Sequence, residues 1–147
     1  MALPTWSRMI RKVRRRGGGI RESGAFLLAR LNTRKVSQFV LYDDLDKTSL
    51  DTGYIRFQGA AYVPLWKLCQ KLGCYVIADV HTHPGKWVGQ SGTDNDHPMI
   101  AQAGHVSLIV PEYAKGNTWG MKNVGVYKYL GEHKWLTDKT AFSLTLL

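Results

Sequence analysis

The hydrophobic pattern of this 147-residue chain consists of short apolar runs and one longer stretch with helical spacing. Strands are expected where apolar runs are bounded by polar or turn-forming residues, at positions 22–30, 36–42, 75–81, 105–110 and 124–130. The run Tyr75–His81 is almost continuously apolar, which is typical of a strand buried on both faces of a sheet. A polar turn is expected between the second strand and the helical stretch, at Asp43–Asp51.

Helical spacing is found between Gln58 and Leu72, where apolar residues recur about once per turn. Gly73 is expected to end this helix, and Pro64 indicates either a kink or a helix that begins close to it. A second, short helix is expected just after Asp94, with Pro98 in its first turn. The resulting order of strands and helices predicts an α/β fold with one central mixed sheet flanked by helices.

Composition and length fit a single globular domain spanning residues 1–147. No run of 18 or more apolar residues is present, so no membrane span is expected. Cys69 and Cys74 lie among apolar neighbours at a spacing that fits no common zinc pattern, and are expected to be buried free thiols. A reducing cytoplasm is therefore the expected compartment. Trp66, Trp119 and Trp135 are expected to serve in core or loop packing.

The first 20 residues or so predict a basic helix followed by a flexible glycine joint. The net charge of +9 is concentrated here, since six cations fall within the first 21 residues: Arg11, Lys12, Arg14, Arg15, Arg16 and Arg21. No apolar stretch follows them, so no secretory signal is expected. A solvated basic face is the favoured interpretation. An acidic protein partner is the alternative, and nucleic acid is a less favoured one.

Two histidines at the end of the apolar run are the strongest chemical signal. Side chains alternate along a strand, so His81 and His83 point to the same side and can bind one metal ion. A catalytic zinc site needs a third protein ligand and an open position for water, and Asp94 supplies the carboxylate, with ten residues between it and His83. Asp79, two residues before His81, shares its side of the strand and is a candidate to orient it.

The set Glu22, His81-x-His83, Ser91 and Asp94 resembles the JAMM motif of the MPN-plus, or JAB-domain, zinc metallopeptidases. This resemblance covers the chain from about Glu22 to Val126. It implies a curved mixed sheet of the cytidine-deaminase-like JAB/MPN type. Other His-x-His enzymes fit less well, because barrel amidohydrolases need roughly 250 residues. The metallo-β-lactamase pattern continues with an aspartate where this chain has Gly85.

The resemblance also implies a role for each residue of the motif. His81, His83 and Asp94 would bind one Zn²⁺ per chain, Glu22 would be the general acid/base, and Ser91 would hydrogen-bond the oxyanion. Trp87, between the two halves of the motif, is expected to wall the substrate groove. Asp96 and His97 are expected to be exposed, and His105 and His133 have no partner evident in the pattern.

The function implied is hydrolysis of an isopeptide or peptide bond at the C-terminus of a ubiquitin-like modifier. The stretches Asp43–Arg56 and Glu112–Asn123 are short, as in compact bacterial deconjugases, some of which are encoded beside ubiquitin-like, E1-like and E2-like proteins. Two alternatives stay open. One is a JAMM-type hydrolase of small peptide or amino-acid conjugates, and the other is a non-catalytic MPN-type binding module.

Overall fold

The computed structural model describes residues 1–118 and 121–146, so Trp119 lies outside the described residues. The helical elements are α1 (Leu3–Gly17), α2 (Tyr42–Leu45), η1 (Gly59–Ala61), α3 (Tyr62–Leu72), α4 (Gly92–Asp96) and η2 (Glu112–Ala114). The strands are β1 (Gly24–Arg30), β2 (Val36–Leu41), β3 (Cys74–Thr82), β4 (Val106–Val110), β5 (Gly125–Gly131) and β6 (Lys134–Thr137). In the described part of the chain, no helix is long and apolar enough to cross a membrane.

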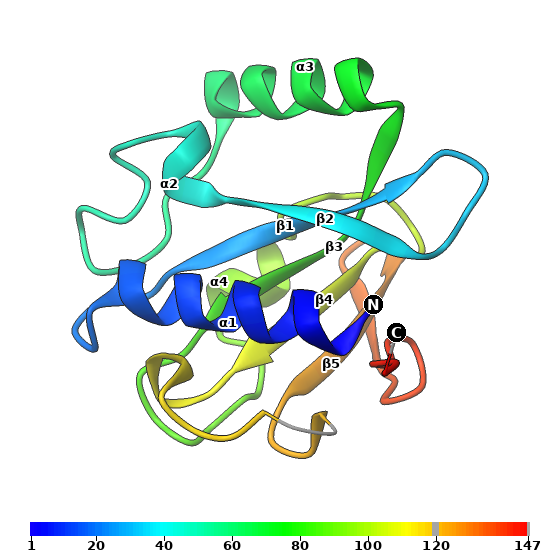
Figure 1. The fold of residues 1–147 in the computed structure, drawn as a ribbon. Helices are drawn as coiled ribbons and strands as arrows, with labels where there is room; N and C mark the ends of the chain where they lie inside the picture. Colours follow the sequence, from blue (N-terminus) through cyan, green and yellow to red (C-terminus); the bar gives the residue numbers. More distant parts are fainter. Residues whose placement is uncertain (119–120, 147) are drawn as a thin grey trace.

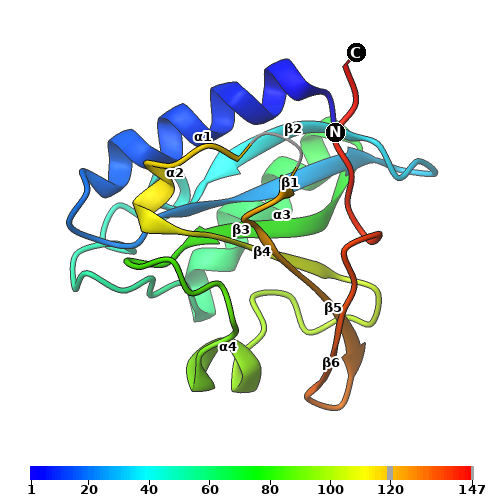
Figure 2. The same ribbon diagram turned by 90° about the horizontal axis from the view of Figure 1, so that it is seen from below.

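All six strands form one sheet in the order β2-β1-β3-β4-β5-β6 (Figure 1). Strands β3 and β4 are parallel, and every other neighbouring pair is antiparallel. Helix α1 lies over one face of this sheet and α3 lies over the other (Figure 2). The predicted α/β fold with a single mixed sheet flanked by helices is therefore confirmed.

Helix α1 contributes its apolar side to the core on the first face of the sheet. Trp6, Met9 and Val13 are at most 1% exposed and pack against side chains of β1, β3 and β4. Each large apolar side chain buried in this way contributes about 1.5–3 kcal/mol to stability. The basic residues expected in this region occupy the opposite, solvent-facing side of the helix.

The glycine run after α1 forms the turn that ends the helix. Gly17 is still helical and buried, and Gly18 ends the helix in the left-handed region with φ of 61°. The Ser23 hydroxyl donates to the Val13 carbonyl at 2.6 Å, next to the position that a Gly17 side chain would occupy. A larger residue at position 17 would therefore push Ser23 away from the helix.

The second face of the sheet has a more aromatic core. The rings of Phe26, Tyr42 and Phe57 pack against one another in edge-to-face or tilted arrangements, with centroids 4.8 to 5.7 Å apart. Leu65 of α3 belongs to the same core. Cys69 also belongs to this core, and both cysteines are buried free thiols, as expected. This face carries the polar site described below.

A β-bulge in β3 decides which side chains reach that second face. Leu27 of β1 pairs with Ala78 and Leu28 with Val76, so Ile77 is an extra residue in β3. Ile77 and Ala78 consequently both pack toward α1, whereas Val76 before the bulge packs in the aromatic core. The bulge thereby shifts the alternation by one residue, so that the side chains at 79 and 81 point away from α1.

Several predicted boundaries need correction. The first strand begins at Gly24, so Glu22 precedes the strand on a loop. The stretch 43–51 is not all turn, because α2 begins at Tyr42. The short helix α4 begins at Gly92 and ends at Asp96, so Pro98 follows it instead of lying in its first turn. The Ser91 cap starts this helix earlier than expected.

Strand β6 was not predicted. Its four residues pair with β5 through a tight turn in which Glu132 and His133 both have positive φ, 51° and 58°. Turns of this kind are normally marked by Asn-Gly or similar pairs, and Glu132-His133 is not such a pair.

Candidate metal centre

Four of the five predicted site residues line a single cavity of about 260 Å³ on the second face of the sheet. These residues are Glu22, His81, Ser91 and Asp94. The fifth, His83, lies one residue beyond the end of β3. Its ring centroid is 5.2 Å from that of His81. Residues from three separate parts of the chain are therefore brought together.

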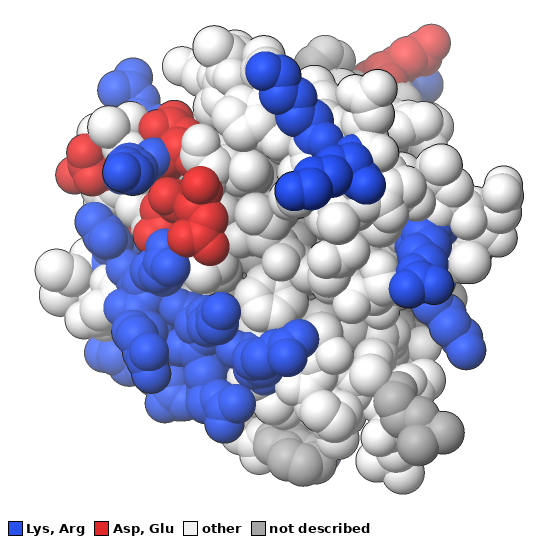
Figure 3. All heavy atoms as spheres, turned by 45° about the horizontal axis from the view of Figure 1, so that its top comes forward, with Lys and Arg blue, Asp and Glu red and all other residues white. Residues whose placement is uncertain are grey.

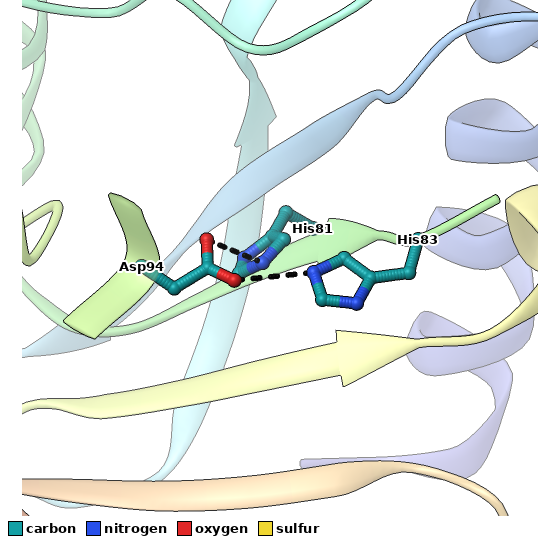
Figure 4. A group of neighbouring side chains, drawn as sticks. All are labelled: His81, His83 and Asp94. Carbon is teal, nitrogen blue, oxygen red and sulfur yellow. Dashed lines mark hydrogen bonds and ion pairs between the residues drawn. The ribbon is translucent and has the colours of Figure 1, made fainter. Parts of the chain in front are cut away.

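The carboxylate of Asp94 faces both imidazole rings (Figure 4). His81 Nε2 is 3.3 Å from Asp94 Oδ1, and His83 Nε2 is 3.2 Å from Asp94 Oδ2. One ligand atom from each residue lies within 4.8 Å of those of the other two. In tetrahedral zinc sites, Zn–N and Zn–O bonds of about 2.0–2.1 Å separate the ligand atoms by roughly 3.3 Å. The group therefore could hold a metal ion.

His81 supports this interpretation through an orphaned atom. Its Nε2 is buried and makes no hydrogen bond of acceptable geometry to any described residue, although the Asp94 carboxylate is close. Burial lowers the pKa of His81, but the nearby carboxylates of Asp79 and Asp94 outweigh this effect and raise the pKa to about 10. For Asp94, burial is likewise outweighed by both histidines, and its pKa is lowered. A metal ion would replace the proton that these carboxylates hold on His81.

The position of His83 is fixed by its main chain and by Trp87. Its N–H donates to the Val110 carbonyl and its carbonyl accepts from the Tyr113 N–H, both at 2.9 Å. His83 Nδ1 lies 3.2 Å from the Trp87 carbonyl, and the Trp87 ring stacks on the imidazole at 23°. Since a carbonyl only accepts, Nδ1 donates to Trp87, and Nε2, 3.2 Å from Asp94 Oδ2, is the ring nitrogen that is left to bind a metal ion.

The position of Asp94 is fixed by a capping box at the start of α4. The Ser91 N–H donates to Asp94 Oδ2 at 2.8 Å, and the Asp94 N–H donates to Ser91 Oγ at 3.1 Å. The sequence Ser91-x-x-Asp94 therefore has a local structural role as well as the one implied by the motif. Because Ser91 Oγ accepts from this N–H, its own proton is available to a ligand in the cavity.

Beneath His81 lies a buried hydrogen-bond network centred on Asp79. This carboxylate is fully buried and lies 3.5 Å from His81 Nδ1, on the side of the ring away from Asp94. Its other partners are His105 Nε2 at 2.7 Å, Ser107 Oγ at 3.2 Å and Tyr42 OH at 3.4 Å. Asp79 thus holds the ring so that Nε2 faces the cavity, the arrangement common around ligating histidines.

Glu22 approaches the same cavity from the loop before β1. Its N–H donates to the Gly53 carbonyl at 2.8 Å. Burial raises the pKa of its carboxyl group, and His81 and His83 oppose this effect, leaving the pKa above its usual value. A raised pKa makes this carboxylate a better proton acceptor than an ordinary glutamate, as a general acid/base requires.

Close approach of β1 to β3 places Glu22 beside the histidines. Gly24 pairs with His81, and a side chain there would lie 2.1 Å from the Val80 carbonyl. Reciprocal bonds add to this contact: the Thr82 N–H donates to the Ser23 carbonyl at 2.9 Å, and the Ser23 N–H to Thr82 Oγ1 at 3.0 Å. Glycine is thus required at position 24 by the site's geometry.

The other residues singled out in the sequence are three tryptophans and several polar residues. Trp87 is 62% exposed beside His83, Trp135 lines the cavity, and Trp66 is exposed on α3, stacked on Tyr62. Asp96 and His97 are exposed, as expected, and His133 lies exposed in the β5–β6 turn.

His105 was without a partner in the sequence pattern, yet it is buried against Asp79. No local pattern marks this contact, because it depends on the pairing of β4 with β3, which places Ser107 opposite Asp79 and His105 just before the strand.

Comparison with known proteins supports the fold. No protein-family model matches the sequence. Among solved structures, the solution structure of protein DSY2949 from Desulfitobacterium hafniense superposes with a TM-score of 0.63 at 12% sequence identity. The match covers 98% of this chain and 89% of that protein. At this identity the similarity concerns the fold alone.

Proposed function

We propose that this protein is a zinc-dependent metallopeptidase of the JAMM type, with the cytidine-deaminase-like JAB/MPN fold. The observation that carries the proposal is the cluster of His81, His83 and Asp94, whose ligand atoms lie within 4.8 Å of one another beside Glu22. Two imidazoles and one carboxylate are a common ligand set of catalytic zinc, and they leave a fourth position for water or substrate.

Each residue has a distinct task in the proposed reaction. Zinc bound at this site would lower the pKa of water and polarise the substrate carbonyl. Glu22 takes a proton from the attacking water and returns it to the leaving amine, as its raised pKa allows. The Ser91 hydroxyl, which lines the same cavity, donates a hydrogen bond to the oxyanion. Asp79 holds His81 in its ligating orientation.

The proposed substrate is the C-terminal tail of a ubiquitin-like modifier, joined through an isopeptide or peptide bond. This choice rests on the resemblance of the motif and on the compact form of the chain. Tyr54, Ile55, Thr93 and Pro98 border the cavity that contains Glu22. An extended tail that ends in small residues would fit beside these side chains more easily than one that ends in bulky residues.

The test combines metal analysis with one substitution. Purified protein should bind about one zinc per chain, and Glu22→Gln should keep the zinc and the fold while hydrolysis falls by a factor of about 10² or more. A ubiquitin-like protein fused through its terminal glycine should be cleaved in preference to an unrelated peptide fusion of equal length. Protein that binds no zinc on re-addition rejects the metallopeptidase. Zinc-loaded protein that cleaves both fusions equally, or neither, rejects the deconjugase.

A further inference from the structure

Strand β2 is an edge of the sheet whose outer side is open. It pairs only with β1, and no backbone hydrogen bond to its outer side is found among the described residues. Its sequence, Val-Ser-Gln-Phe-Val-Leu, contains no charge and no proline. Most natural edge strands are short or carry charges or proline that discourage pairing with another chain. The other edge, β6, has only four residues and includes Lys134.

Cations surround this open edge. Arg8 and Lys12 of α1 lie over the ring of Phe39 in β2, at 5.7 Å and 5.9 Å from its centroid. Arg34 and Lys35 immediately precede the strand in sequence and are exposed. Figure 3 shows Lys and Arg gathered into one patch over α1. The exposed cations of α1 that make up this patch are Arg8, Arg11, Lys12, Arg14 and Arg15.

The charge of this patch is left largely uncompensated. Arg16, at the end of α1, is bound by Asp43 at 2.7 Å and by Asp44 at 3.0 Å. No ion pair is found for the five patch cations among the residues that the structure describes. A ligand that approaches β2 along α1 therefore meets positive charge along its whole path.

We propose that β2 binds an acidic, extended polypeptide segment, which adds to the sheet as a further strand. Every second side chain of such a strand would face α1, at intervals of about 6.8 Å. Cations one helical turn apart, such as Arg8 and Lys12, are spaced at about 6 Å along α1. Carboxylates at alternate positions of the added strand would therefore match the cations, while the backbone pairs with β2.

Other occupants fit the edge less well. A second copy of the chain would bring two basic patches together, and like charges would oppose the pairing of β2 with itself. A nucleic acid would satisfy the cations but has no peptide backbone to pair with the strand. The combination of an open, neutral edge with a flanking basic row therefore favours an acidic polypeptide.

The test uses a labelled peptide of alternating Glu and Val with capped ends, titrated with the full chain at low ionic strength. Saturable binding is expected by fluorescence anisotropy. Replacing Arg8 and Lys12 together by Gln should weaken it at least about fivefold, because two of the matched cations are lost. The matched control replaces Lys67 and Lys71, exposed cations of α3 on the other face of the sheet, by Gln and should bind as the wild type does. Thermal unfolding of both variants checks that the fold is kept.

Two N-methylated peptides separate strand pairing from plain charge attraction. Methyl groups on alternate residues block the amides of one edge of the peptide, so one of the two peptides should lose binding and the other should keep it. Equal binding by both, or equal loss by both, would overturn the proposal. So would the absence of saturable binding, duplex DNA that binds more tightly and is not displaced by the peptide, or self-association through β2.

Discussion

Replacing Asp79 by Asn tests whether the buried network supports the metal centre. Asp79 Oδ2 is shared by His81 Nδ1, Ser107 Oγ and Tyr42 OH, and Oδ1 accepts from His105 Nε2 at 2.7 Å. An amide has only one oxygen. If that oxygen keeps the three partners on one side, the NH₂ group faces His105 Nε2, which must then accept a hydrogen bond.

The Asp79→Asn substitution should lower the free energy of unfolding because of the other nitrogen of the His105 ring. If Nε2 accepts, the proton moves to His105 Nδ1, which is buried without a hydrogen-bond partner among the described residues. A buried donor left unsatisfied costs about 1–3 kcal/mol of unfolding free energy. The neutral amide also weakens the hold on His81, and losses of this kind typically lower metal affinity about 10- to 100-fold.

Zinc affinity should be measured by competition with a chromophoric chelator, and stability by urea unfolding with and without zinc. The matched control is Asp96→Asn, which removes the same charge from an exposed position two residues after Asp94 and should change neither quantity. An Asp79→Asn protein with the wild-type zinc affinity, within about twofold, would refute the role assigned to this network.

Three further predictions concern the same centre. Because the pKa of His81 is raised from 6.5 to about 10, the metal-free protein should lose stability as pH rises between these values. Over the same range zinc should bind about tenfold more tightly per pH unit, since it replaces the proton on His81; chelator competition near pH 7 and 8 measures this. Ser91→Ala should remove an N-cap worth about 1 kcal/mol in urea unfolding and lower kcat with little change in KM; unchanged kcat would exclude the oxyanion role. Gly24→Ala should cost about 3 kcal/mol or more, since its Cβ would meet the Val80 carbonyl, and a variant as stable as wild type would contradict this contact.

Much of the site was predictable because its residues lie in locally regular segments. The i, i+2 pair of histidines at the end of an apolar run required only strand alternation, which continues from His81 in β3 to His83 just beyond its end. The capping box that orients Asp94 was also present in the sequence, but its effect on where α4 starts was missed. Glu22 precedes its strand, and its proximity to the histidines depends on long-range pairing of β1 with β3.

The buried partners of Asp79 could not be predicted from local pattern. His105 and Ser107 reach Asp79 because β4 pairs with β3 in parallel, placing Ser107 opposite Asp79. Parallel register depends on the crossover through α4, more than twenty residues long, and no local signal fixes it. Tyr42 reaches the network from the opposite side, through the turn from β2 into α2.

Strand alternation alone would also have placed the histidines on the wrong face. Cys74 and Val76 pack in the aromatic core under α3, so unbroken alternation from them would send residues 79 and 81 toward α1. The extra residue at Ile77 reverses this parity, and His81 then shares a face with Asp79 and the cavity. A pattern argument predicts that two side chains share a side, but only the pairing with β1 determines which side that is. The position of the metal centre therefore depends both on the His-x-His spacing and on a bulge four residues before His81, which the hydrophobic pattern does not reveal.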